Sequence, residues 1–99
     1  MYTIVERRKV NPERLQETSQ RAESDFFPKL RAADGFTGFY LVPDEVQGIY
    51  TAIVVWASKA QADAFEAESS AWQRTLEEHG HAHQSANRGE TVVHLEPPR

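Results

Sequence analysis

The sequence predicts an α+β fold whose elements follow the order β-α-β-β-α-β. Two amphipathic helical patterns alternate with four segments rich in β-forming residues, and the 99 residues contain no repeat or linker. Two adjacent predicted strands are apolar on both faces, which indicates a sheet that is covered on both sides. We therefore expect a single domain over residues 1–99.

The first strand and the first helix are predicted within the first third of the chain. Residues 2–10 begin with β-formers, and Asn11 followed by Pro12 predicts a helix start, because asparagine caps helices and proline fits the first turn. Pro28 predicts a kink or break inside this helix, and Gly35 predicts its end. The apolar positions that repeat at helical spacing are Leu15, Ala22, Phe26 and Leu30.

A β-hairpin and a second helix are predicted next. Residues 36–42 and 49–57 are rich in aromatic and β-branched residues, and the short polar turn between them favours antiparallel pairing. Ser58 has the spacing of a capping box, and an apolar helical face continues from there until Gly80. We expect one uninterrupted helix between these two residues.

The end of the chain completes the predicted order with a polar loop over residues 81–89 and a short strand over 91–95. This order is that of ferredoxin-like folds, with a four-stranded antiparallel sheet and two helices on one face. Because the strands at 36–42 and 49–57 are apolar on both sides, we expect a second copy to cover the other face, giving a homodimer through the sheet. The alternative is a mildly exposed sheet of ordinary β-formers.

Composition narrows the function by exclusion. The absence of cysteine excludes disulfides, thiolate metal ligands and thiol nucleophiles. A net charge of -4 argues against nucleic-acid binding, and the charged run at residues 6–9 is interpreted as a solvent-exposed strand end. No apolar stretch approaches a membrane span, and the N-terminus becomes charged too early for a signal peptide, so we expect a cytoplasmic protein.

The group His79, His81 and His83 has three imidazoles within five residues. A glycine interrupts the group, and no cysteine is present to complete a four-ligand set. We therefore expect no metal site. His79 is instead interpreted as a helix-end residue, and the other two as members of a solvated loop.

Two segments resemble the antibiotic biosynthesis monooxygenase family. Residues 27–41 (FPKLRAADGFTGFYL) are similar to its P-L-L-R…G-F-x-G-Y-Y segment, and residues 55–62 (VWASKAQA) to its W-x-S-x-x-x-A junction. The resemblance implies a dimeric α/β barrel with a ligand pocket between the sheet and the helices of each subunit. It also implies cofactor-independent oxidation of an aromatic or quinol-type substrate by oxygen; the alternative is a non-catalytic barrel that binds a small ligand.

The resemblance also directs attention to a general base and to pocket walls. Haem-degrading members have a histidine ligand on the second helix where this chain has Thr75, so we expect no cofactor. Cofactor-free oxygenation requires a base. An imidazole, with an ordinary pKa of about 6.5, suits this role. The candidates are His79 and His94. Taken singly, each of these two is better explained as an ordinary helix-end or edge-strand residue.

Aromatic side chains are the predicted walls of the pocket, because flat walls suit a flat aromatic ligand. The alternative is that they are ordinary core residues. The candidates are Phe26, Phe65 and Trp72 on the helices and Tyr40 and Trp56 on the strands.

Overall fold

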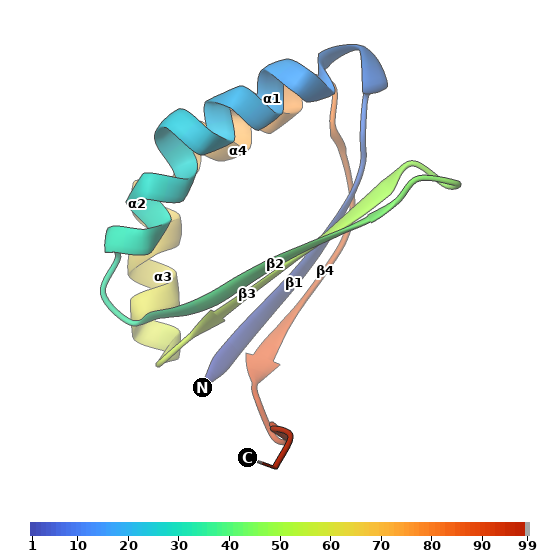
Figure 1. The fold of residues 1–99 in the computed structure, drawn as a ribbon. Coiled ribbons are helices and arrows are strands. Elements are labelled where there is room, and N and C mark those ends of the chain that lie inside the picture. The colour runs from blue at the N-terminus through green and yellow to red at the C-terminus, as the bar shows by residue number, and fades with distance from the viewer. Residues whose placement is uncertain (99) are drawn as a thin grey trace.

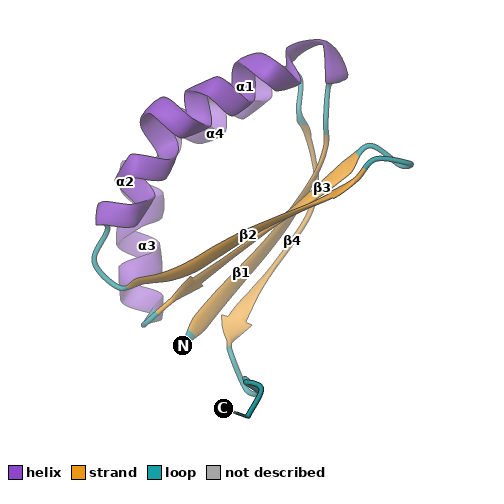
Figure 2. Cartoon of the chain, viewed as in Figure 1, coloured by secondary structure: helices purple, strands orange, loops and turns teal. Residues whose placement is uncertain are grey.

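The computed structural model describes residues 1–98 and has the predicted order of elements (Figures 1 and 2). The four strands are β1 (Tyr2–Lys9), β2 (Phe36–Asp44), β3 (Ile49–Trp56) and β4 (Ala82–Glu90). They form one antiparallel sheet in the order β2-β3-β1-β4. Two helical segments cover one face of this sheet, and the chain leaves the other face open (Figure 1). The ferredoxin-like prediction is therefore confirmed.

The first helical segment changes its hydrogen-bonding pattern just before Pro28. It consists of a 3-10 turn η1 (Pro12–Arg14), α1 (Leu15–Arg21), a π-helical turn η2 (Ala22–Phe26) and α2 (Phe27–Ala32). Proline has no N–H, and its ring clashes with the carbonyl four residues back in a regular helix. The helix widens at this point, and the Phe27 N–H donates to the Ala22 carbonyl. The predicted kink is thus a π turn.

The second helical segment is broken at Ser69, where the prediction of one uninterrupted helix is wrong. It consists of α3 (Lys59–Glu68) and α4 (Ser70–Glu78), and Ser69 has φ -103° and ψ 16°. Serine hydroxyls compete for backbone hydrogen bonds, which makes this pair of serines a weak point in a helix. The predicted start is confirmed, because the Ser58 hydroxyl accepts the Gln61 N–H at 3.3 Å.

The last strand lies earlier in the chain than predicted. β4 covers the segment that was expected to be a loop, and residues 91–98 form no strand. β4 lies at the edge of the sheet, and its pairing with β1 runs from Tyr2↔Glu90 to Lys9↔Ala82. Its residues are mostly exposed and polar, so no alternation of apolar residues marks it as a strand. In Figure 1 the chain beyond β4 leaves the sheet and runs away from the helices.

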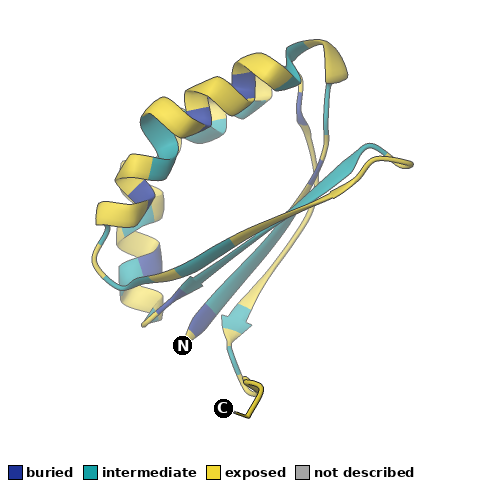
Figure 3. Cartoon of the chain, viewed as in Figure 1, coloured by how far each residue is buried: buried dark blue, intermediate teal, exposed yellow. Residues whose placement is uncertain are grey.

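The cluster of buried apolar side chains lies at one end of the sheet, where β1 begins and β3 ends, while the buried residues near the other end are polar (Figure 3). Its members are Tyr2, Leu30, Trp56 and Ala62. Tyr2 and Trp56 face each other at the end of the β1–β3 ladder, and Trp56 is 1% exposed. Since the core is confined to this end, it does not fill the space between the helices and the rest of the sheet.

The sheet face opposite the helices carries apolar side chains. Val5, Ile53 and Tyr40 form one row across three strands of this face. Tyr40 and Val42 are 59% and 54% exposed. Both faces of the sheet are therefore apolar, as the strand pattern predicts.

Among residues 1–98, no helix has the length and apolar character required to cross a membrane.

Candidate functional site: a cavity between sheet and helices

A cavity of about 720 Å³ lies between the helices and the inner face of the sheet. Ile4, Glu6 and Arg8 line it as alternate residues of β1, because successive side chains of a strand point to opposite faces. Their partners on β3 continue the wall across the sheet. Those partners are Val54, Ala52 and Tyr50.

Aromatic side chains from both the helices and the strands form much of the cavity wall. Phe26 and Trp72 are stacked, with ring centroids 4.8 Å apart and an interplanar angle of 9°. The Phe65 ring lies 6.0 Å from Phe26 and 5.2 Å from Trp56, and Phe39 meets Phe26 edge-on at 6.3 Å. All five of these residues line the cavity. Four of the predicted wall residues are therefore brought together here.

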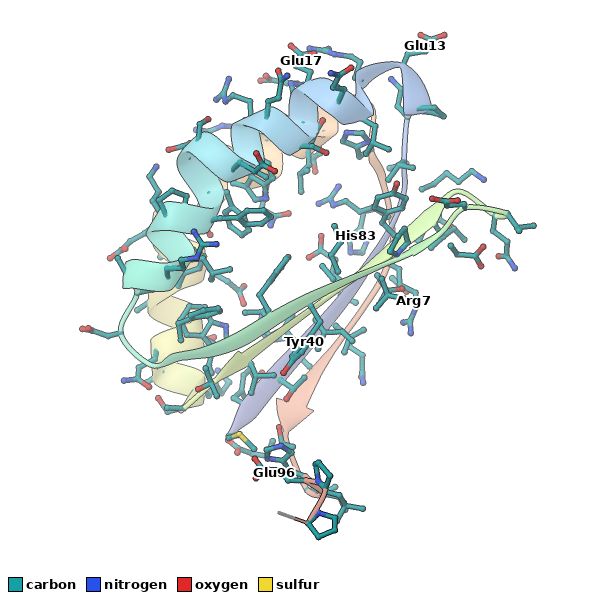
Figure 4. All side chains as sticks on the ribbon, viewed as in Figure 1. Arg7, Glu13, Glu17, Tyr40, His83 and Glu96 are labelled. Carbon is teal, nitrogen blue, oxygen red and sulfur yellow. The ribbon has the colours of Figure 1, made fainter. Side chains whose placement is uncertain are left out.

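Tyr40, the fifth predicted wall residue, lies outside the cavity. It is on the open face of the sheet, as Figure 4 shows, while its neighbour Phe39 takes the inward position. The reason is strand alternation, which gives neighbouring residues opposite faces. The register of β2 against β3 decides which of the two points inward, and a shift between Phe36 and Gly38 sets that register.

Arg8 forms a polar end of the cavity, and its side chain is held on three sides. Nε donates to Glu6 Oε1 at 2.9 Å, Nη1 to the His81 carbonyl at 2.8 Å, and Nη2 to Gln73 Oε1 at 2.8 Å. Arg8 is 8% exposed, so its interpretation as part of a solvent-exposed charged run is wrong. Arg7, next to it, does point away from the helices (Figure 4).

His81 also lines the cavity, and it is 2% exposed, although it was expected in a solvated loop. Its Nδ1 accepts the Asn11 N–H at 3.0 Å, and its Nε2 lies 2.7 Å from Thr18 Oγ1. Because Nδ1 is an acceptor, the network assigns the proton to Nε2, which donates to Thr18. Burial lowers the pKa of His81, and the charges of His79 and Arg8 lower it further. The imidazole is therefore neutral, with both nitrogens hydrogen-bonded inside the protein.

The two predicted base candidates are not brought together. His79 is buried at the end of α4 with Nδ1 2.6 Å from Thr18 Oγ1, and it is absent from the cavity walls formed by residues 1–98. His94 follows β4 instead of lying in a strand, and its Nε2 is 3.7 Å from Glu96 Oε1. Within residues 1–98, no three His, Asp or Glu side chains are placed to hold a metal ion.

The sequence pattern did not predict the polar end of the cavity at Arg8, because charged residues at a strand end normally indicate solvent exposure. One signal was present in the sequence. Glu6 and Arg8 are alternate residues that continue the series Tyr2 and Ile4, and alternate residues of a strand lie on the same face, here the inward one. His81 gave no comparable signal. It follows Gly80, which has φ +83°, and the turn there directs the chain back toward the sheet.

A cavity between one sheet face and its helices, with apolar walls and a few converging polar groups, is the usual form of a small-molecule site in an α+β protein. The family model for antibiotic biosynthesis monooxygenases matches residues 1–86, and the chain belongs to this family. The resemblance seen in the sequence is thereby confirmed.

Solved structures from several bacteria share the fold. A Deinococcus radiodurans protein, described as a candidate antibiotic biosynthesis monooxygenase, has a TM-score of 0.82 and 13% identity over 100% of both chains. The monooxygenase of the Streptomyces coelicolor gene ActVA-Orf6, in complex with Nanaomycin D, has a TM-score of 0.76 and 13% identity over 98% of this chain and 92% of that chain.

A third structure is SnoaB, a cofactor-independent oxygenase from Streptomyces nogalater. It has a TM-score of 0.68 and 17% identity over 99% of this chain and 97% of that chain. At these identities the structural similarity shows the fold alone. No curated protein sequence matches the chain.

Proposed function

We propose that the chain binds a small aromatic or quinol-type molecule in its cavity and oxidises it with molecular oxygen, without a cofactor. The proposal rests on the cavity itself, whose walls include both the Phe26–Trp72 stack and the polar end formed by Arg8. The S. nogalater protein, a cofactor-independent oxygenase, and the S. coelicolor monooxygenase, which holds Nanaomycin D, support it through their shared fold.

The proposed reaction needs no external reductant. A base removes a proton from the substrate, and the electron-rich anion then transfers an electron to oxygen. When a ring CH₂ becomes C=O, one oxygen atom is retained and the other leaves as water with the two hydrogens. The substrate supplies all the electrons, so the protein has to bind, orient and deprotonate it.

Glu6 is the proton acceptor that we propose. His81 has both ring nitrogens engaged, and His79 and His94 lie outside the cavity walls. The Glu6 carboxylate lines the cavity, is half-buried and uses Oε1 to accept from Arg8, whose N–H fixes its position.

Oxygen uptake tests the proposal directly. The purified protein is expected to consume oxygen with at least one member of a panel of quinols and anthrones, and Glu6→Gln is expected to lower that rate by about 10²-fold or more, the usual range of a lost general base. Glutamine still accepts the Arg8 hydrogen bond, so ligand affinity should be kept. Absence of uptake across the panel would contradict the enzymatic proposal.

A non-catalytic binding protein is the second candidate, favoured by one observation. The only imidazole that lines the cavity within residues 1–98 is His81, and its hydrogen bonds fix it as a neutral structural group. Saturable binding of the same quinols without oxygen uptake would establish this candidate.

We also propose that two copies associate through the open face of the sheet. The row formed by Val5, Ile53 and Tyr40 supports this, because large apolar surfaces of this kind are covered in stable proteins.

A further inference from the structure

We propose that Arg8 is the residue that orients the ligand, by holding an uncharged oxygen, a carbonyl or a hydroxyl, of a flat aromatic molecule. The inference rests on the proposed function, because it presupposes that the cavity binds an aromatic ligand. It adds a specificity: the cavity should prefer an aromatic molecule with a neutral oxygen at one end over a hydrocarbon or an aromatic acid.

The guanidinium of Arg8 is held in place before any ligand arrives. Three of its five N–H groups are used by Glu6, Gln73 and the His81 carbonyl, which come from β1, α4 and the turn before β4. The remaining N–H groups belong to a side chain that lines the cavity and is 8% exposed. A donor fixed in this way binds an oxygen acceptor without losing side-chain freedom, and its charge strengthens the hydrogen bond.

The charges around the cavity favour a neutral oxygen over a carboxylate. Arg8 is paired with Glu6 at 2.9 Å, so its positive charge is already compensated. His81 is neutral, for the reasons given above. The other charged residues of the wall are Glu23, Glu66 and Arg88, so carboxylates outnumber guanidinium groups. An anionic ligand would therefore meet net repulsion and a desolvation cost.

The polar end and the apolar core lie at opposite ends of the β1–β3 ladder, which defines an orientation for a bound ligand. Arg8 pairs with Tyr50 at one end of the β1–β3 ladder, and Tyr2 pairs with Trp56 at the other end, where the core lies. The six residue steps from Tyr2 to Arg8 correspond to roughly 20 Å of strand. A ring system that lies against the Phe26–Trp72 stack can therefore direct one oxygen toward Arg8 while its other end points to the core.

Three probes with the same ring system test the specificity: naphthalene, 1-naphthol and 1-naphthoate. Equilibrium dialysis measures their affinities for the wild-type protein, with the absorbance of each probe reporting its free concentration. We expect 1-naphthol to bind about tenfold more tightly than naphthalene, the effect of one hydrogen bond to a charged donor. We expect 1-naphthoate to bind more weakly than 1-naphthol. Equal affinities for naphthalene and 1-naphthol would overturn the inference.

The residue assignment is tested with Arg8→Met and the matched control Arg7→Met. Arg8→Met should remove the preference for 1-naphthol over naphthalene, whereas Arg7→Met, on the opposite sheet face, should retain it. Retention of the preference in a folded Arg8→Met protein would overturn the assignment to Arg8. If Arg8→Met does not fold, Arg8→Lys, which keeps the charge and loses the planar fork, should show a reduced preference, and an unchanged one would overturn the assignment.

Failure of the inference and failure of the proposed function give different results. If none of the three probes binds, the aromatic-ligand proposal itself is contradicted. If all three bind with similar affinity, the cavity is an aromatic site, and only the role of Arg8 is refuted.

Discussion

His81 occupies a position that suits only the neutral form of its side chain. The Asn11 N–H points at Nδ1 at 3.0 Å, so a proton on that nitrogen would face another proton. The nearby charges of His79, Arg8 and Arg14 act in the same direction as burial and lower the pKa of His81. Thr18, its other partner, is uncharged. Protonation of His81 therefore costs more free energy in the folded chain than in the unfolded chain.

This linkage predicts a pH dependence of stability. The pKa of His81 is lower in the folded than in the unfolded chain, so the unfolded chain binds the proton first as the pH falls below about 6.5. The free energy of unfolding should therefore increase from about pH 5.5 to about pH 7.5, as followed by urea denaturation. His81→Asn, whose side-chain oxygen can still accept from Asn11, should flatten this slope.

The control for the pH experiment is His83→Gln. His83 is exposed on β4, so its removal should leave the slope as in the wild type. A slope that is identical in wild type, His81→Asn and His83→Gln would show that His81 is not the group responsible.

At the scale of elements, the two helical segments meet through the Phe26–Trp72 stack. Phe26 is the last residue of the π turn, and Trp72 lies in the first turn of α4. The near-parallel rings at 4.8 Å predict a coupling free energy of about 0.5–1.5 kcal/mol in a double-mutant cycle of Phe26→Leu and Trp72→Leu. Chemical denaturation of the four proteins measures it, and additive effects would mean that the rings do not stabilise each other.

The connection between α2 and β2 depends on Gly35, which has φ +82°. A Cβ at this position would lie 2.1 Å from Gln61 Oε1 and 2.9 Å from Gln61 Cβ. Gly35→Ala should therefore cost at least about 1–2 kcal/mol of stability, the penalty of the left-handed conformation alone. Gly89→Ala is the matched control, because a Cβ there meets no atom within 4 Å. Equal thermal stability of the two variants would contradict this explanation.

Elements with strong local signals were predictable from the sequence, and the rest depended on tertiary contacts. Asn11, Ser58 and Gly80 marked helix ends where the structure has them. β4 was misplaced because an edge strand needs only backbone pairing with β1, which leaves no apolar alternation. Arg8 was missed because its partners Gln73 and His81 are 65 and 73 residues away. The polar end of the cavity is a product of the fold and has no local motif.

At the scale of the whole molecule, the open sheet face predicts association into a dimer. Light scattering should give twice the mass of one chain, and Ile53→Glu, at the centre of the apolar row, should give a monomer with an unchanged circular dichroism spectrum. Ala67→Glu, on the exposed side of α3, is the control and should remain dimeric. A wild-type protein that is monomeric at micromolar concentration would contradict the prediction.

A ligand that binds in the cavity, as proposed above, would also stabilise the folded chain. The cavity takes the space that core side chains would otherwise fill, and the buried cluster around Trp56 packs only one end of the sheet against the helices. A molecule that binds only the folded chain stabilises it by mass action, by about 2.7 kcal/mol at a hundredfold excess over its dissociation constant. The melting temperature therefore becomes a measure of occupancy, and a thermal-shift screen of aromatic compounds can find ligands even where no turnover occurs.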